Sequence, residues 1–164
     1  MAAAGLNEMV VESVRVHMLS SQHVVILRDA QRERYLPIWI GPWEANAIAM
    51  RLQGVTPERP MTHDLFSQAL GELGVEIRQI VVSDLAEDTF RARLLLELDG
   101  KTVDIDARPS DAIALAVRCG VPIFATDEVL DRAAVVPESE EDEKLAPFRE
   151  FVNSLEFDLP GEEG

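Results

Sequence analysis

The segment TFRARLLLELDGKTVDIDARPSDAIALAVRCG, residues 89–120, decides the fold class. Apolar and polar side chains alternate over residues 89–98, a period of two that predicts a β-strand with one buried face. Asp99 and Gly100 accept the positive φ angles of a two-residue turn, so residues 101–107 should pair back as the second strand of a hairpin. An almost wholly apolar run then begins after Pro109 and ends at Gly120, which predicts a buried helix.

Three strands and two helices are expected before this segment. Runs rich in Val and Ile predict strands over residues 10–19, 23–28 and 34–40. A helix should run from Pro42 to Gly54, and Thr62 should cap a second helix that ends at Gly74. The apolar side of the second helix is expected to face the core with Leu65, Phe66, Ala69, Leu70 and Leu73. A strand over residues 75–82, a short strand over 122–125 and a helix over 126–133 capped by Thr126 complete the pattern.

These elements predict an α+β fold with a mixed, largely antiparallel sheet packed against several helices. A single domain should cover residues 1–136, and residues 137–164 should form an acidic C-terminal tail. Residues 138–164 carry a net charge of −8 out of −15 for the whole chain. Leu145, Phe148 and Leu155 recur at helical spacing, so part of the tail is expected to be helical, either as a solvated appendage or as a helix that competes with nucleic acid for the body.

Composition limits the classes of protein to which the chain can belong. Its 164 residues, 47 % of them hydrophobic, are enough for one globular core, and no apolar run is long enough to span a membrane. The first residues lack a secretory pattern, so we expect a cytoplasmic protein without membrane association. A lone Cys119 excludes an internal disulfide, and no dinucleotide, P-loop or zinc motif is present, so no organic cofactor is expected. The net charge of −15 argues against simple electrostatic binding of nucleic acid.

Two short segments place ionisable residues at predicted helix starts. Glu44 lies in the first turn after Pro42, where it could bind a metal or simply complement the helix dipole. His63 could transfer protons near neutral pH, and Asp64 beside it could bind a divalent cation. A capping Thr62 followed by an early acidic residue would, however, need no function at all.

The segment VDIDARPSDA, residues 103–112, is the most informative about chemistry. Asp104 and Asp106 are two residues apart on a strand and therefore share a face. Arg108, Ser110 and Asp111 follow at a helix start, where free N–H groups and a guanidinium favour a phosphate. This combination suits Mg²⁺ or Mn²⁺ and phosphodiester chemistry. The structural alternative is that Ser110 or Asp111 caps the helix while Arg108 pairs with one carboxylate.

Three motifs in order resemble the bifunctional nuclease family, formerly grouped as a domain of unknown function. They are LPIWIGPWEANAIAMRLQGV at 36–55, RPMTHDLFSQALGELGVEI at 59–77 and DIDARPSDAIALAVRCGVPIFATDEVL at 104–130. The resemblance covers roughly residues 9–136 and implies an α+β domain, a homodimer or larger assembly, and nuclease activity on RNA and DNA by metal-assisted or acid/base chemistry. The family-like positions are Gly41, Glu44, Ala45, Arg59, Pro60, Thr62, His63, Asp64, Arg108, Pro109, Ser110 and Asp111. The acidic tail lies outside the resemblance.

The leading hypothesis is a nuclease that hydrolyses phosphodiester bonds of RNA or DNA without sequence preference. Its catalytic residues would be His63, Asp64, Arg108, Ser110 and Asp111. Asp104, Asp106, Asp111 and Glu44 would hold Mg²⁺ or Mn²⁺, and Arg91, Arg93 and Arg108 would bind substrate. The alternative is a non-catalytic, oligomeric binding or regulatory module that holds a small anionic ligand at Arg108 and Ser110 and buries Trp39 and Trp43 between subunits.

Overall fold

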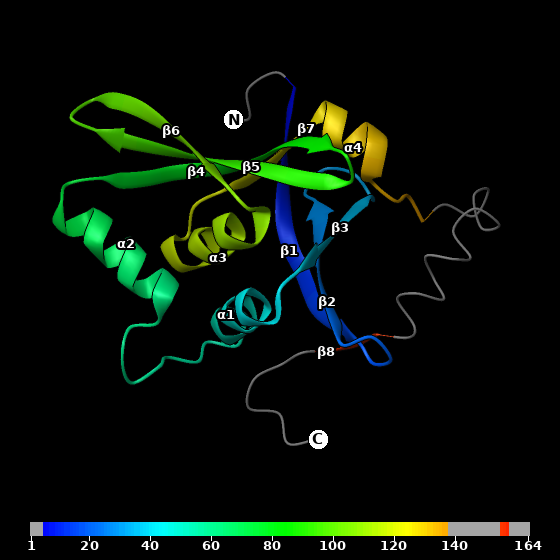
Figure 1. Ribbon diagram of the computed structural model, residues 1–164. Helices are drawn as coiled ribbons and strands as arrows, with labels where there is room; N and C mark the ends of the chain where they lie inside the picture. Colours follow the sequence, from blue (N-terminus) through cyan, green and yellow to red (C-terminus); the bar gives the residue numbers. More distant parts are fainter. Residues whose placement is uncertain (1–4, 138–154, 158–164) are drawn as a thin grey trace.

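One mixed sheet forms the centre of the protein, and the computed structural model describes residues 5–137 and 155–157 (Figure 1). The strands are β1 (Leu6–His17), β2 (Gln22–Asp29), β3 (Tyr35–Ile40), β4 (Glu76–Ala86), β5 (Thr89–Leu98), β6 (Lys101–Ala107), β7 (Ile123–Thr126) and β8 (Leu155–Phe157). They lie in the order β3-β2-β1-β7-β4-β5-β6, and β8 pairs with β1. Only β4 and β7 pair in parallel among the described strands, so the predicted α+β class with a largely antiparallel sheet is confirmed.

Four helices are described: α1 (Pro42–Leu52), α2 (Thr62–Glu72), α3 (Pro109–Cys119) and α4 (Asp127–Ala133). The predicted burial of α3 is confirmed, because it packs against β4 and β5 on one side and contacts α1 and α2 on the other. Figure 1 shows α1, α2 and α3 together beside the β4, β5 and β6 ribbons. Ile48 of α1, Ile80 of β4 and Ile113 of α3 are fully buried in one core cluster with Leu27 and Leu36. None of the helices within the described residues is long and apolar enough to cross a membrane.

Two hairpin turns determine how β4, β5 and β6 pair. Asp99 and Gly100 have φ angles of 51° and 77°, as predicted for a two-residue turn between β5 and β6. Glu87 and Asp88 also have positive φ angles, 51° and 62°, and join β4 to β5 without a glycine. As a result β4 extends to Ala86, beyond the expected end at residue 82.

Several predicted boundaries and caps need correction. The first strand is Leu6–His17 and not 10–19, because its start pairs with β7. Met61, not Thr62, is the N-cap of α2, and its N–H donates to Asp64 at 3.0 Å. Arg108 is the N-cap of α3, so neither Ser110 nor Asp111 caps that helix. Thr126 caps α4 as predicted, by accepting from the N–H of Val129.

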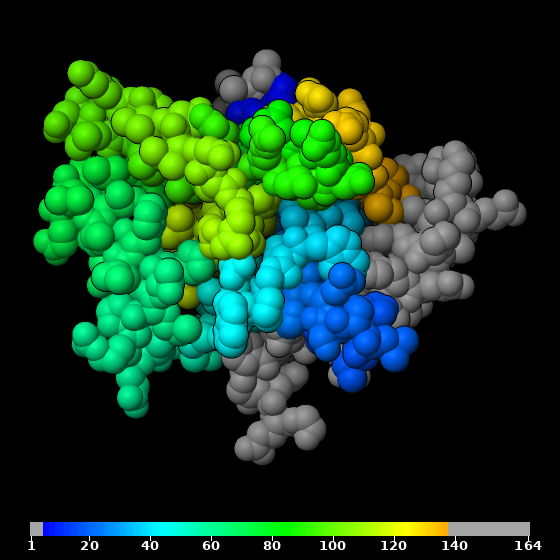
Figure 2. All heavy atoms as spheres, in the orientation of Figure 1, coloured from blue at the N-terminus to red at the C-terminus, as the bar shows by residue number. Residues whose placement is uncertain are grey.

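The orientation of α2 differs from the prediction. No residue of α2 is fully buried, and Leu65, Phe66 and Leu73 just beyond it are exposed by 61 %, 43 % and 74 %. The side of α2 turned toward α3 carries polar residues, since His63 contacts Asp111 and Ser67 contacts Cys119. The inward side of α2 therefore combines these polar residues with Leu70, which packs against the core, whereas Leu65 is exposed. Figure 2 shows α2 at the edge of the molecule.

The structure describes residues 5–137 without a gap, and the domain boundary at residue 136 stays a prediction. Most of the predicted acidic tail, including Leu145 and Phe148, lies outside the described residues. At Leu155, where the helical pattern was expected to end, the structure instead has the short strand β8.

Asp29 predicts an acid-sensitive contribution to stability. The side chain of Asp29 is buried, and burial by itself raises its pKa. Three hydrogen bonds outweigh this effect and lower the pKa below its usual value. Their donors are the N–H of Gln31, the Arg34 side chain and the N–H of Arg32. The unfolded chain therefore binds this proton at a higher pH, near 3.9, so the stabilisation by Asp29 is present above that pH and is lost as the pH falls from there toward the lower pKa of the folded state.

We expect Asp29→Asn to lower the free energy of unfolding by about 1–3 kcal/mol at pH 7, because a charged acceptor is lost from three hydrogen bonds. Urea unfolding from pH 7 to pH 3 checks this, and the difference from the wild type should shrink toward pH 3. Asp131→Asn, at an exposed position on α4, is the matched control. A difference that stays constant across this range would contradict the assignment.

Candidate functional site

A chain of polar contacts joins α2, α3 and α1 at one point. The Nε2–H of His63 donates to Asp111 Oδ1 at 3.0 Å, and the Nε–H of Arg108 donates to Asp111 Oδ2 at 2.8 Å. Arg108 Nη1 also lies 3.3 Å from Glu44 Oε1. The structure therefore brings His63, Arg108, Asp111 and Glu44 together, all four of which were predicted site residues.

Helix starts and the end of β6 place these side chains. Arg108 follows β6 directly and serves as the N-cap of α3, while Asp111 lies in the first turn of that helix. His63 is the second residue of α2, and Glu44 lies in the first turn of α1. Because three helices begin near one another, the acidic side chains lie where helix dipoles favour negative charge.

The contact chain borders a cavity of about 600 Å³. Its lining residues are Thr62, His63, Phe66, Leu94, Ile105, Asp106, Ala107, Arg108, Asp111 and Leu115. His63 and Glu44 are largely buried, with 12 % and 13 % of their side-chain surface exposed, whereas Arg108 is 67 % exposed. Arg108 can thus contact a solute while the histidine is held at the cavity wall.

Electrostatics fix the charge and orientation of this cluster. A hydrogen bond from Arg108 to Asp111 and the charges of Asp111 and Glu44 raise the pKa of Arg108, despite partial burial, so its guanidinium stays protonated. A carboxylate that accepts from one ring nitrogen of a histidine fixes the tautomer and the ring orientation. Asp111 therefore holds His63 with Nδ1 as the ring nitrogen available to accept a proton.

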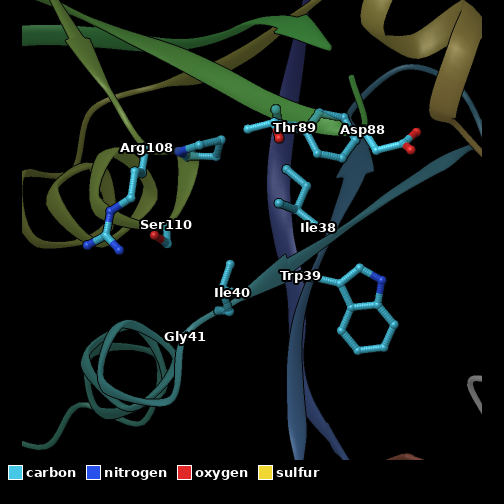
Figure 3. A pocket seen from close by; sticks show the side chains of 10 residues that line it. Ile38, Trp39, Ile40, Gly41, Asp88, Thr89, Arg108 and Ser110 are labelled. Carbon is cyan, nitrogen blue, oxygen red and sulfur yellow. The ribbon is translucent and has the colours of Figure 1, made fainter. Parts of the chain in front are cut away.

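Two of the predicted catalytic residues lie elsewhere. Asp64 turns away from the cavity and accepts from Arg118 at 2.7 Å and from the N–H of Met61. Burial raises the pKa of Asp64, but these two hydrogen bonds and the Arg118 charge lower it below its usual value. Ser110 is 6 % exposed and lines a second cavity, which Arg108 also borders (Figure 3).

The predicted metal ligands do not form one group. Among the described residues, no three His, Cys, Asp or Glu side chains lie close enough to hold a metal ion together. Asp104 and Asp106 lie 2.6 Å and 3.9 Å from Arg93, while Asp111 and Glu44 pair with Arg108. The protein side chains alone therefore do not fit a Mg²⁺ or Mn²⁺ site of three or more ligands, because arginines occupy these carboxylates.

The expected basic patch is also divided. Leu94 and Ile105 line the cavity, and strand alternation places Arg93 and Arg91 on the opposite face of the sheet. Arg108 is the predicted substrate-binding arginine that lies at the cavity.

Sequence reasoning missed Arg118 and the apolar wall of the cavity. Arg118 is 7 % exposed and donates to Asp64 and to the carbonyls of Ala47 and Ala114. In the sequence it resembles an ordinary cation at the end of a helix, and no local signal indicates that it connects three helices. Phe66 was expected to pack in the core, and it instead lines the cavity together with Leu94 and Leu115.

Gly41 provides a test of the Glu44 contact. A Cβ atom at Gly41 would lie 2.6 Å from Glu44 Oε1, which is too close, so Gly41→Ala should push the Glu44 carboxylate away from Arg108. We expect a change in thermal stability equivalent to about 1 kcal/mol or less, since the pair is partly exposed. Thermal unfolding of Gly41→Ala, Glu44→Gln and the double variant checks this. Fully additive effects would contradict the contact.

Similarity to known proteins agrees with these motifs. Residues 25–138 match the Bifunctional nuclease domain. An uncharacterized protein of Mycobacterium tuberculosis is 40 % identical over 162 residues, covering 93 % of this chain and 97 % of that protein. Bifunctional nuclease 1 of Oryza sativa is 25 % identical over 114 residues, covering 67 % of this chain and 34 % of the plant protein. Bifunctional nuclease 1 of Arabidopsis thaliana is 31 % identical over 91 residues, covering 54 % and 28 %. The chain thus matches only about a third of each plant protein, and it belongs to the bifunctional nuclease domain family.

Proposed function

We propose that this protein is a nuclease that hydrolyses phosphodiester bonds in single-stranded RNA and DNA at the cavity beside His63. The observation that carries the proposal is the contact chain from His63 through Asp111 to Arg108. It places a histidine oriented by a carboxylate next to an exposed, permanently charged guanidinium. The plant relatives that bear the name bifunctional nuclease support the same class of reaction.

In this proposal Arg108 binds the phosphate and His63 accepts a proton. A water oxygen attacks phosphorus as Nδ1 of His63 takes the water proton, and the bond from phosphorus to the leaving oxygen breaks. The leaving oxygen then takes up a proton from solvent or from protonated His63. Arg108 stabilises the negative charge that develops on the phosphate oxygens, which is the usual role of a guanidinium in phosphoryl chemistry.

The proposed use of Mg²⁺ or Mn²⁺ depends on the substrate. Asp111 is the predicted metal ligand whose carboxylate belongs to the contact chain at the cavity, whereas Asp106 borders the cavity but has its carboxylate 3.9 Å from Arg93. Mg²⁺ is commonly held by one or two carboxylates together with substrate phosphates, and a bound ion would supply neutralisation of phosphate charge. Cleavage with Mg²⁺, with Mn²⁺ and with EDTA separates metal-assisted cleavage from cleavage by His63 alone.

The test is cleavage of labelled single-stranded RNA and DNA by the wild type and Asp111→Ala, purified in the same way. We expect the wild type to cut and the variant to lose at least about a hundredfold in rate, because His63 and Arg108 both lose their shared partner. Equal cutting by both would point to a contaminating nuclease and overturn the assignment. The absence of cutting, together with a thermal shift caused by phosphate or other small anions, would favour the non-catalytic anion-binding module.

Salt dependence should be shallow for this protein. Apart from Arg108 the described cavity lining has no cation, and Arg91 and Arg93 lie on the opposite face of the sheet. Each phosphate contact on a single strand contributes a slope of about −0.7 to a plot of log K against log salt. We expect a slope of about −1 in the plot of log K against log salt for binding of single-stranded RNA, measured by fluorescence anisotropy at about 50 to 200 mM NaCl. A slope of about −4 or steeper would require a basic surface that this cavity lacks.

We also propose that the protein forms a homo-oligomer. Apolar side chains outside the cavity lining are exposed on α2 and on the edge strand β6, notably Leu65 and Val103. Exposed apolar patches and unpaired strand edges are typical of surfaces covered by another chain. Light scattering on purified protein measures the mass, and a monomer at all concentrations would contradict this proposal.

A further inference from the structure

A second cavity of about 400 Å³ also borders on Arg108 (Figure 3). It is lined by Ile38, Trp39, Ile40, Gly41, Asp88, Thr89, Phe90, Arg108, Pro109 and Ser110. Its volume is within the range of clefts that hold small organic ligands, about 300–1,000 Å³. Because Arg108 lines both cavities, a group bound to its guanidinium would have neighbours in each.

One end of the second cavity is suited to an anion. The Ser110 side chain is more than nine-tenths buried and borders this cavity. Figure 3 shows Ser110 and Arg108 at the same end of the cavity. The first turn of α3 also presents N–H groups that have no acceptor within the helix. A buried hydroxyl, a guanidinium and a helix start together form a suitable environment for a phosphate.

The opposite end is aromatic. Trp39 is 50 % exposed although it belongs to a strand, and Figure 3 shows its indole on the far side from Arg108. Phe90 of β5 also lines this cavity, is partly buried and packs against the core. Exposed aromatic rings beside a phosphate-binding group are typical of proteins that stack the bases of single-stranded nucleic acid.

We propose that the second cavity binds one nucleotide of the substrate, with its phosphate at Arg108 and Ser110 and its base against Trp39. This inference rests on the proposed nuclease function for its link to cleavage. The nucleotide would be the neighbour of the phosphodiester bond that is cut at His63. Binding of a free nucleoside monophosphate can nevertheless be measured without any cleavage.

Tryptophan fluorescence gives a direct test, because the chain contains only Trp39 and Trp43. Trp43 is 81 % exposed and lines neither cavity, so Trp43→Phe leaves Trp39 as the only tryptophan, whose fluorescence can be excited selectively over that of Tyr35. We expect adenosine monophosphate to quench the Trp39 fluorescence of this variant. Ribose 5-phosphate and inorganic phosphate should bind without comparable quenching. In Trp39→Phe, where Trp43 remains, adenosine monophosphate should cause no quenching. Quenching of Trp43 alone, or of neither residue at millimolar ligand, would overturn the proposal.

Binding and cleavage by three further variants separate the two ends of the cavity. Trp39→Ala should weaken the binding of adenosine monophosphate at least about tenfold, a loss within the range for base stacking, and leave the binding of inorganic phosphate unchanged. Ser110→Ala should weaken the binding of both ligands. Trp43→Ala is the matched control and should change neither, and circular dichroism verifies that each variant is folded.

The outcomes distinguish this inference from the proposed function. If the wild type cleaves RNA and Trp39→Ala has an unchanged KM with no loss of adenosine monophosphate binding, the nucleotide site is wrong and the nuclease stands. If Trp39 is quenched as expected and no variant or wild type cleaves, the nucleotide site stands and the nuclease is wrong. If adenosine monophosphate quenches Trp39 and the Trp39→Ala variant has a KM for RNA that is raised about tenfold, both the nucleotide site and the nuclease function are supported.

Discussion

We expect His63→Ala to lower kcat for cleavage of single-stranded RNA by about 10²–10⁴-fold, the usual contribution of a general base, and to leave KM within about twofold. The reason is that, in the proposed mechanism, His63 at the cavity wall accepts the proton, whereas Arg108 binds the phosphate. The measurement is steady-state cleavage of a labelled oligonucleotide by the wild type and the variant. A rise in KM with unchanged kcat would instead make His63 a binding residue.

Controls separate proton transfer from structural damage. His17→Gln changes a histidine of β1 that lies in neither cavity lining, and it should cleave as the wild type does. Imidazole added to His63→Ala should restore part of the rate, since the base can be supplied from solution to a cavity of about 600 Å³. Rescue would not be expected if His63 only held α2 in place.

Asp111→Asn tests whether the two residues act as a unit. The asparagine keeps the size of the side chain and loses the charge that orients the His63 ring. We expect the double variant with His63→Ala to be no slower than His63→Ala by itself, because groups that act together have non-additive effects. Multiplicative losses would show that Asp111 acts independently of His63, through Arg108.

Local sequence signals predicted the part of the fold that carries the site. The alternation over β5, the Asp99-Gly100 turn and the Gly120 stop are short-range features, and β5, β6 and α3 occur at the predicted positions. The Glu87-Asp88 turn was missed because neither residue is a glycine, although both have positive φ angles. The extension of β4 follows from that turn, so one missed local feature moved a whole boundary.

The arrangement of the site was less accessible from the sequence. His63 and Asp111 were both candidates, but they are 48 positions apart, and their contact depends on how α2 packs against α3. Hydrophobic periodicity predicted that Leu65, Phe66 and Leu70 would face the core, but Leu65 is exposed and Phe66 borders the cavity, while Leu70 alone of the three packs against the core. Pattern analysis assumes that a helix buries its apolar side, which fails where a polar side is held by specific interhelical contacts.

Arg118→Met should produce the largest loss of stability among the variants considered, about 3 kcal/mol. The guanidinium of Arg118 is 7 % exposed, and its removal leaves the Asp64 carboxylate and two helix carbonyls without their donor. Methionine has a similar length and no charge, so the effect comes from the lost hydrogen bonds and ion pair. Urea unfolding at pH 7 measures the change. Arg51→Met is the matched control, because Arg51 is exposed and makes longer contacts of 3.4–3.5 Å.

The same variant shows whether the interior of the helix cluster positions the site. Arg118 binds Asp64, the residue next to His63, and thereby fixes the start of α2 against α1 and α3. Because the pKa of Asp64 is lowered, Asp64 stabilises the fold above about pH 4, and this contribution is lost as the pH falls. In Arg118→Met the free energy of unfolding should therefore depend less on pH in this range. If Arg118→Met also lowers kcat under conditions where it is fully folded, the ion pair maintains the geometry of His63 and Asp111. A folded variant with reduced stability and unchanged kcat would show that the contact chain at the cavity maintains its own geometry.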